Sequence, residues 1–245
     1  MPVLFGRVNR ATVRGVAHLG YEARPLRGVT CCGSLHAHNG DLEGARRLAR
    51  AMLRASRNEQ QREGVPAPIV VNSAGCSAHM KELAQLFDAD DPDRAAAEVL
   101  AARLRLRRVR RAAHAQAPPE RSIEGAWKGP FAWDDPCHLC HAQGIRTQPR
   151  EVLGEIPGAN WKALQDSESC CGSAGIYSIL RPKDSAAVLA PKLDALERSG
   201  ARTLVTANPG CQLQWENGIA ERGLDVEVVH LAELVARAYE GRTVE

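Results

Sequence analysis

Short apolar segments alternate with longer amphipathic ones along most of the chain. In the N-terminal part, the spacing of apolar residues predicts a helix over residues 8–19 and a short strand over 21–26. A long helix is expected at about 41–58, a buried strand at 69–72, and a further helix at about 78–87. Each predicted strand in this part therefore precedes a predicted helix.

The same alternation continues through the C-terminal part. The expected elements are strands at 130–135, at 160–164 and within 202–211, helices at about 143–153, 183–199 and 212–222, and a closing strand and helix within 226–239. Short apolar strands that alternate with helices are typical of parallel α/β structure. The sequence therefore predicts Rossmann-like layers in which helices flank small parallel sheets.

An internal repeat divides this pattern into two. The tetrapeptide Cys-Cys-Gly-Ser occurs at 31–34 and again at 170–173, and a Gly-Cys dipeptide follows each copy, at 75–76 and 210–211. A repeat of this length indicates two similar structural units. We expect a first cysteine-rich lobe at 1–101, an arginine-rich helical linker at 102–125 and a second cysteine-rich lobe at 126–245.

The two copies differ at their starts. Copy two opens with a strand and Cys137, 33 residues before its cysteine pair. The equivalent position in copy one would lie just upstream of Met1. We therefore expect the first lobe to lack its leading strand and cysteine, and the chain to be shortened at its start.

Composition narrows the class of protein. The chain has no run of about 20 apolar residues and no secretory signal at its start, so neither a membrane span nor export is expected. A net charge of +3 is too small to indicate a nucleic-acid partner. We expect a cytoplasmic protein, and stable disulfides are rare in that compartment. Its 8 cysteines therefore indicate metal or redox chemistry.

The cysteines of copy two follow three predicted strands. Cys137, Cys170, Cys171 and Cys211 offer four thiolates from three loops, which suits iron–sulfur or zinc. His138 is a further candidate ligand or a donor to one. Cys140 completes a Cys-x-x-Cys motif, whose spacing fits either a redox dithiol or a thiol packed against a helix.

Copy one carries Cys31, Cys32 and Cys76, with His79 nearby. Three thiolates and a histidine suit zinc, and an iron–sulfur cluster would be expected if the upstream cysteine were restored. The chain has no glycine-rich nucleotide motif, no P-loop and no nucleophile-elbow serine. We therefore expect one-electron transfer through metal clusters and no catalytic residue of its own.

Five segments carry a family resemblance. They are CCGSLHAHNGD, NSAGCSAHMKE, DDPCHLCHAQGIRTQPR, ESCCGSAGIYSI and ANPGCQLQ. Together they resemble the iron–sulfur subunits of glycolate oxidase (glycolate dehydrogenase), within the wider family of CCG cysteine-rich domains. That family also includes the B subunit of heterodisulfide reductase and a lactate-utilisation protein.

The resemblance implies two pseudo-symmetric Rossmann-like lobes whose cysteines bind metal. It implies a 4Fe-4S cluster on Cys137, Cys170, Cys171 and Cys211, and an iron–sulfur or zinc site on Cys31, Cys32 and Cys76. Electrons would pass from flavin-containing subunits, which oxidise glycolate to glyoxylate, towards the respiratory chain. A ferredoxin-like domain typical of that subunit is absent here, so a separate ferredoxin-type domain or subunit is implied. The complex would be cytoplasmic, with peripheral association at the inner face of the cell membrane.

The departures from the family leave alternatives open. His79 and Gln214 stand where the heterodisulfide reductase branch has the second cysteine of a Cys-x-x-Cys motif, which favours the glycolate branch. A length of 245 residues resembles the lactate-utilisation protein, which is the alternative within the family. From other classes, the alternatives are a zinc-stabilised structural module and a non-functional fragment.

Overall fold

The computed structural model describes residues 4–64, 66–104 and 127–240. These residues form two compact units, a larger one within Met1–Glu22 and Ala112–Glu245 and a smaller one within Ala23–Arg111. The larger unit contains the second-lobe cysteines, and the smaller unit contains Cys31, Cys32 and Cys76. Across the described residues, no helix has the length and apolar character needed to span a membrane.

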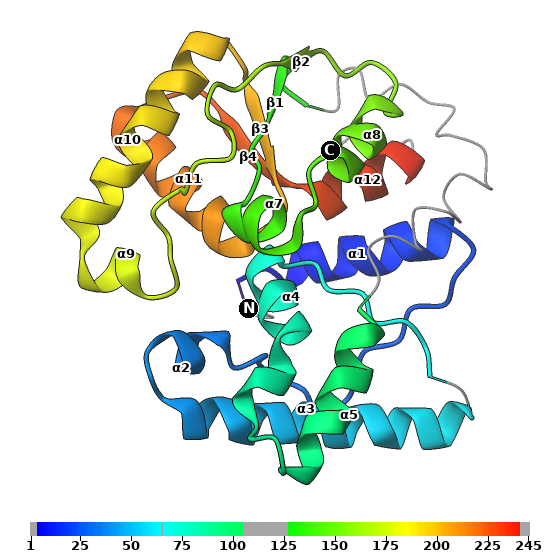
Figure 1. Ribbon diagram of the computed structural model, residues 1–245. Helices are drawn as coiled ribbons and strands as arrows, with labels where there is room; N and C mark the ends of the chain where they lie inside the picture. Colours follow the sequence, from blue (N-terminus) through cyan, green and yellow to red (C-terminus); the bar gives the residue numbers. More distant parts are fainter. Residues whose placement is uncertain (1–3, 65, 105–126, 241–245) are drawn as a thin grey trace. The chain divides into compact units, whose positions relative to one another are not determined.

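The larger unit is built on a four-stranded sheet. Its strands are β1 (Phe131–Trp133), β2 (Trp161–Lys162), β3 (Thr203–Thr206) and β4 (Glu227–His230), in the order β2-β1-β3-β4 (Figure 1). All three pairings are parallel. β1 and β3 are buried along their whole length, as expected for inner strands covered on both faces. The predicted parallel α/β class is confirmed.

Seven helices accompany this sheet among the described residues. They are α1 (Gly6–His18), α7 (Cys137–Gln143), α8 (Thr147–Gly154), α9 (Tyr177–Leu180), α10 (Pro182–Ser199), α11 (Pro209–Arg222) and α12 (Leu231–Glu240). Proline opens α10 and α11, where no backbone donor is lost. The helix predicted at about 143–153 corresponds to α8, which begins only at Thr147. Gly144 adopts a φ of 64° and ends a separate helix, α7, that was not predicted.

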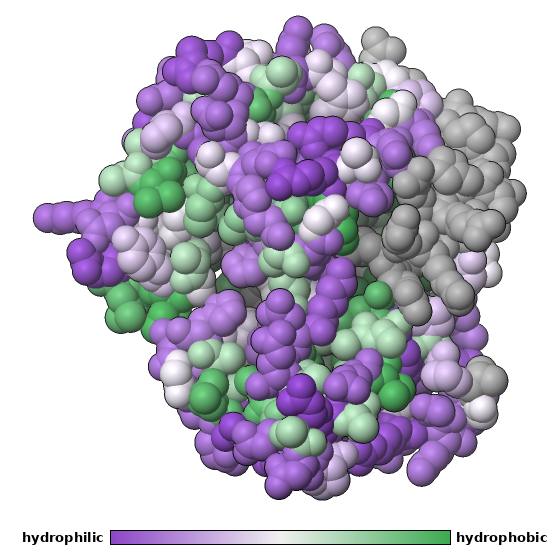
Figure 2. All heavy atoms as spheres, in the orientation of Figure 1, coloured by the Kyte–Doolittle hydropathy of each residue, from purple (hydrophilic) through white to green (hydrophobic). Residues whose placement is uncertain are grey.

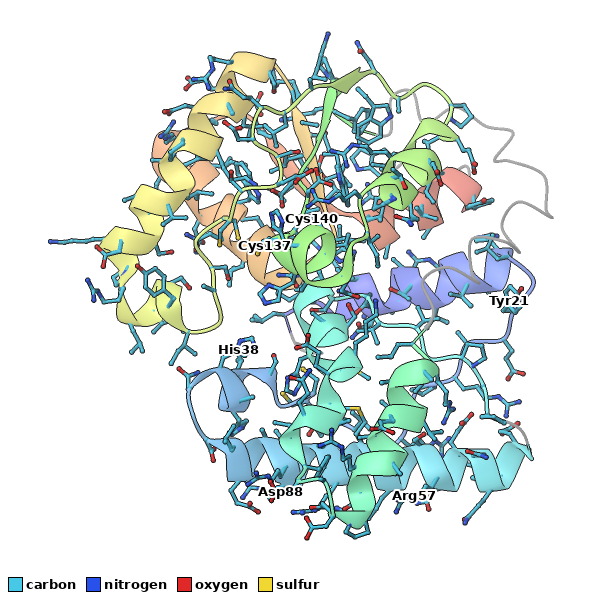
Figure 3. All side chains as sticks on the ribbon, in the orientation of Figure 1. Tyr21, His38, Arg57, Asp88, Cys137 and Cys140 are labelled. Carbon is cyan, nitrogen blue, oxygen red and sulfur yellow. The ribbon has the colours of Figure 1, made fainter. Side chains whose placement is uncertain are left out.

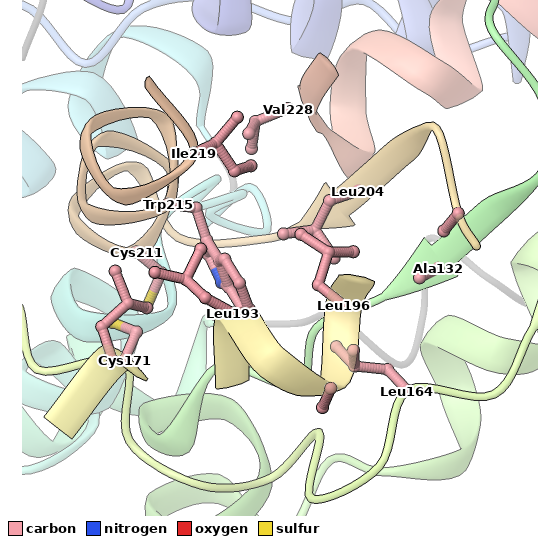
Figure 4. Close-up of a cluster of buried hydrophobic side chains, with 13 residues drawn as sticks. Ala132, Leu164, Cys171, Leu193, Leu196, Leu204, Cys211, Trp215, Ile219 and Val228 are labelled. Atoms are coloured by element: carbon pink, nitrogen blue, oxygen red, sulfur yellow. The ribbon is translucent and has the colours of Figure 1, made fainter. Parts of the chain in front are cut away.

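The core of the larger unit lies between the sheet, α10 and α11. Leu193 and Leu196 of α10 pack with Leu204 of β3 and with Trp215, which is fully buried on α11 (Figure 4). Cys171 and Cys211 belong to the same buried cluster. Two of the candidate ligands therefore lie against a close-packed apolar wall.

Helix α1 belongs to the larger unit, although the predicted boundaries assign residues 1–101 to the first lobe. Its buried stripe of Val8, Ala11 and Gly15 contributes to packing against α12. Arg7 adds ion pairs to Glu216 and Glu233, at 3.6 and 3.2 Å. The helix expected at 8–19 is confirmed. The predicted linker at 102–125 lies almost entirely outside the described residues, so the division into lobes stays a prediction.

The smaller unit is mostly helical. It contains α2 (Ser34–His38), α3 (Leu42–Glu63), α4 (Ala74–Lys81), the 3-10 helix η1 (Leu83–Leu86) and α5 (Pro92–Ala102). Met52 and Leu53 of α3 pack with Leu83, Phe87 and Leu100 in its core. The helix predicted at 41–58 is confirmed as α3, and the one at 78–87 is divided between α4 and η1.

The strands predicted at 21–26 and 69–72 do not form ladders in the described part of the smaller unit. Ile69 makes an isolated parallel bridge with Leu104, and residues 21–26 are irregular. Strands need partners for their backbone groups, and Pro25 removes one donor from the first segment. The sheet expected in the first lobe is therefore reduced to one bridge among the described residues.

The N-cap of α5 gives a stability prediction. Asp91 accepts a hydrogen bond from the Asp93 amide at 2.8 Å and precedes Pro92 at the first helical position. We expect Asp91→Ala to lower the free energy of unfolding by about 1 kcal/mol, because one helix-end donor loses its partner. Asp91 also pairs with Arg50 at 3.1 Å, so the control in urea denaturation is Asp91→Asn, which keeps a capping oxygen and removes the charge. Equal effects of both substitutions would contradict the capping role.

Candidate metal centre

Three adjacent strands deliver the second-lobe cysteines to one edge of the sheet. Cys137 follows β1, the pair Cys170 and Cys171 follows β2, and Cys211 follows β3. β1 lies between β2 and β3, and all three run parallel, so their carboxyl ends meet. Loops at this edge of an open α/β sheet are the usual place for a ligand.

The four sulfurs form a continuous series. Hydrogen-bond contacts join Cys137 to Cys170, Cys170 to Cys171, and Cys171 to Cys211. Cys171 and Cys211 are 3% and 4% exposed, whereas Cys170 is exposed and Cys137 is half-buried. All eight cysteines of the chain are free thiols. The structure brings the four predicted ligands together, and their role as ligands stays a prediction.

The series is poised to begin deprotonation at Cys170. Hydrogen bonds from Cys137 and then from Cys171 lower the pKa of Cys170. The pKa of Cys137 and that of Cys171 are raised, because each has Cys170 as a hydrogen-bond partner and each is desolvated by burial. Thiols must lose their protons to bind a metal, so a cation arriving here would replace the shared protons.

The two Cys-Cys-Gly motifs have the same local geometry. The amide of Gly33 donates to Cys31 Sγ, and the amide of Gly172 donates to Cys170 Sγ, both at 3.4 Å. Both glycines have a positive φ, 89° and 84°, a conformation that side chains rarely adopt. A Cβ at Gly172 would lie 2.5 Å from the Ser185 carbonyl oxygen. Glycine is therefore required where the motif turns beside its first sulfur.

The last cysteine of each set lies in the first turn of a helix. Cys76 follows the N-cap Ser73 of α4, whose side chain accepts from the Cys76 amide at 3.4 Å. Cys211 follows the N-cap Asn208 of α11, whose Nδ2 donates to Cys211 Sγ at 3.3 Å. The positive end of a helix dipole favours a thiolate. Both positions therefore suit the charged form of the ligand.

The first-lobe thiols also meet. A hydrogen bond between Cys32 and Cys76 raises the pKa of Cys32, and it lowers the pKa of Cys76 to about 7. Burial lowers the pKa of His79, whose ring lies edge-on to His38 with centroids 6.3 Å apart. The His79 Nε2 atom is buried and has no hydrogen-bond partner in the structure, which fits a nitrogen available to a metal.

The two remaining candidate ligands, Cys140 and His138, lie on α7. Figure 3 labels Cys137 and Cys140 of this helix. Cys140 Sγ contacts the carbonyl oxygens of Asp135 and Cys137 at 4.0 and 3.8 Å, and no contact joins it to the four sulfurs. It lies within 4.8 Å of potential ligand atoms of His141 and Glu168, but Arg146 bonds to both of these residues. The contacts of Cys140 resemble those of a thiol packed against backbone carbonyls, and its role as a ligand stays a prediction.

His138 lies closer to the series of sulfurs. Its Nδ1 atom is 3.6 Å from Cys137 Sγ. At that distance, the ring fits a donor to a ligand sulfur better than a ligand in its own right.

Four charged residues around these loops were not predicted from the sequence. Asp134 and Asp135 are each 1% exposed between β1 and Cys137, and they pair with Lys192 and Arg150 respectively. One signal was available. Lys192 falls on the apolar stripe of α10 between Leu189 and Leu196, where a lysine is unexpected without a buried partner.

The chain is similar to known proteins over most of its length. The CCG cysteine-rich domain model matches residues 2–81 and 131–216. The chain is 32% identical to the probable glycolate oxidase iron-sulfur subunit of Bacillus subtilis over 97% of this chain and 52% of that protein. It is 31% identical to the glycolate oxidase iron-sulfur subunit of Escherichia coli over 98% and 56%. Lactate utilization protein A of Exiguobacterium sp. is 26% identical over 95% and 91%.

These matches confirm the resemblance found in the cysteine motifs. The chain spans about half the length of the two glycolate oxidase subunits and about nine-tenths of the lactate utilization protein. The family model covers both cysteine-rich segments, including all of the predicted ligands. The chain belongs to the CCG cysteine-rich domain family.

Proposed function

We propose that this chain is the iron–sulfur electron-transfer subunit of a glycolate-oxidising flavoenzyme complex. The series of four sulfurs at one sheet edge carries the proposal, since it is a soft donor set gathered from three loops. Cys137, Cys170, Cys171 and Cys211 would hold a 4Fe-4S cluster. That cluster would supply one-electron transfer, and the chain itself would turn over no substrate.

The names of the relatives and the surroundings of the sulfurs support a cluster over a single zinc ion. Both glycolate oxidase relatives are named iron-sulfur subunits. Cysteine thiolates are the usual ligands of iron–sulfur clusters. The buried wall of Cys171 and Cys211 would exclude water from one side of such a core.

The first lobe offers a second, smaller donor set. Cys31, Cys32 and Cys76 with His79 would hold an iron–sulfur cluster or zinc. The orphaned His79 nitrogen and the Cys32–Cys76 contact support a metal there. Their roles are separable from those of the second lobe, because the two sets lie in different compact units.

The relatives support an oxidoreductase subunit and favour glycolate by identity. The glycolate oxidase subunits are 32% and 31% identical to the chain, against 26% for the lactate utilization protein. The second candidate is lactate oxidation with the same role for this chain, and the match to the lactate utilization protein covers 91% of that protein. In both candidate functions, another subunit of the complex would oxidise a 2-hydroxy acid.

The proposal implies partners. Flavin-containing subunits would oxidise glycolate to glyoxylate, a ferredoxin-type domain or subunit would extend the path, and the respiratory chain at the inner face of the membrane would receive the electrons. Apolar side chains around α9 support a partner surface beside the cysteine loop, as Figure 2 shows. On that helix, Ile179 is 76% exposed and Leu180 65%.

Dye reduction by the assembled complex tests the function. The chain would be co-expressed with candidate flavin subunits and supplied with either glycolate or lactate. We expect glycolate-dependent dye reduction that requires this chain. Reduction with lactate alone would favour the second candidate, and stoichiometric zinc without iron in the purified chain would overturn both in favour of a structural module.

A further inference from the structure

A buried lysine lies beside the proposed centre and is not part of its donor set. Lys192 of α10 is 2% exposed. Its ammonium donates to Asp134 Oδ1 at 2.7 Å and to the carbonyl oxygens of Ser167 and Ser169, both at 2.8 Å. All three of its donors are therefore used, and two of them hold the segment that leads directly into Cys170.

The lysine links the loops that carry the ligands. Its partner Asp134 follows β1, three residues before Cys137, and accepts a second hydrogen bond from Thr206 at the end of β3. A single ion pair thus joins the carboxyl ends of β1 and β3 to the loop after β2. Ser167 is held a second time, by the Asp135 carboxylate, at 2.7 Å.

Stability alone does not account for such a pair. Replacing a buried ion pair by well-packed apolar side chains is often neutral or stabilising, because both charges lose their hydration. Lys192 also lies over the Trp215 ring, at 5.5 Å from its centroid, within an otherwise apolar core. A charge kept in this position indicates a specific use.

The charge of Lys192 can act on the nearby cysteine ligands. Lys192 donates to the carbonyl oxygen of Ser169, the residue directly before Cys170, so its positive charge lies next to a proposed ligand. A thiolate-ligated cluster gains negative charge on reduction, and a buried positive charge favours the more negative state, since low dielectric strengthens the interaction. The paired carboxylate of Asp134 opposes this effect, so replacing the lysine alone would leave an unpaired negative charge beside the centre and disfavour its reduction. With Asp134 in place, the ammonium therefore orients one ligand loop and favours the reduced centre.

We propose that Lys192 is a positioning residue for the second-lobe centre, fixing the segment before Cys170 and raising the reduction potential of the bound cluster. This rests on the proposed iron–sulfur function. It predicts that the uncharged Lys192→Met retains less iron than the unsubstituted chain and has a more negative midpoint potential. Lys192→Arg keeps the charge and should recover part of both losses.

The test compares anaerobically reconstituted full-length variants by iron content, acid-labile sulfide and a spectroscopic redox titration. Lys183→Met, an exposed lysine on the same helix, is the matched control and should behave as the unsubstituted chain. Asp134→Asn/Lys192→Met leaves no unpaired charge in the core, so a loss of iron in this variant would reflect lost positioning of the ligand loop and not misfolding. We expect it to fold with normal helicity and still retain less iron, because the carbonyl oxygens of Ser167 and Ser169 have lost their donor.

The outcomes are distinguishable. An iron-free unsubstituted chain would overturn the proposed function itself. Two results with an iron-loaded unsubstituted chain would overturn only the role of Lys192. One is an unchanged iron content and midpoint potential in Lys192→Met, and the other is an unchanged iron content in the double variant. A loss that Lys192→Arg does not restore at all would also contradict the role proposed for its charge.

Discussion

Cys211→Ser is expected to remove nearly all iron and sulfide from the second-lobe centre. Cys211 is 4% exposed, lies in the first turn of α11 and receives a hydrogen bond from Asn208, so its sulfur is held in a fixed position. A serine oxygen is a harder and much less acidic ligand than a thiolate, and it suits iron–sulfur chemistry poorly. The absorbance at about 400 nm expected for such clusters should disappear with the iron.

Cys140→Ser provides the matched control for this substitution. It makes the same chemical change at a buried thiol, 1% exposed, that bonds to backbone carbonyls rather than to the four sulfurs. Both variants should be made in a Cys76→Ser background, so that first-lobe metal does not contribute. Equal iron in the two variants would show that the four-sulfur series does not bind the cluster.

Gly172→Ala is expected to lower the free energy of unfolding by about 3 kcal/mol and to prevent cluster assembly. The residue has a φ of 84°, and a Cβ would lie 2.5 Å from the Ser185 carbonyl oxygen, which is backbone and cannot swing aside. The substitution would also disturb the hydrogen bond that Ser185 Oγ donates to the Gly172 carbonyl, at 2.9 Å. The loop that presents Cys170 and Cys171 would have to move.

Gly200→Ala separates the cost of the positive φ from the cost of the close contact with Ser185. Gly200 also has a positive φ, 68°, but a Cβ there meets nothing within 4 Å. The backbone conformation alone should therefore cost about 1 kcal/mol there, with iron binding unchanged. Urea denaturation and metal analysis of both variants measure the difference, and equal losses would mean that the close approach to Ser185 is unimportant.

Much of the larger unit could be predicted from sequence because its strands are short apolar runs between clear helix signals. The strand within 202–211 and the helix that follows it match β3 and α11, with Pro209 and Gly223 marking the ends of the helix. The predicted strands also correctly placed the second-lobe cysteine loops at strand ends. The shared amide-to-sulfur bonds at Gly33 and Gly172 show that the two copies agree in local geometry.

The parts that escaped prediction depend on tertiary partners. Apolar alternation at 21–26 and 69–72 cannot say whether a neighbouring strand exists, and in the described residues only Ile69 finds a partner, Leu104. Helix α1 carried an apolar stripe, but its packing partner α12 is far away in the sequence. The Asp134–Lys192 pair was likewise missed, because its two members come from different elements.

The central claim is that four thiolates of the second lobe hold one iron–sulfur core. Combined iron, acid-labile sulfide and zinc analysis of the anaerobically purified Cys76→Ser chain tests it most directly. The predicted result is about four iron atoms and about four sulfides per chain, as a single 4Fe-4S cluster requires, without stoichiometric zinc. One zinc ion per chain, with neither iron nor sulfide after reconstitution, would contradict it.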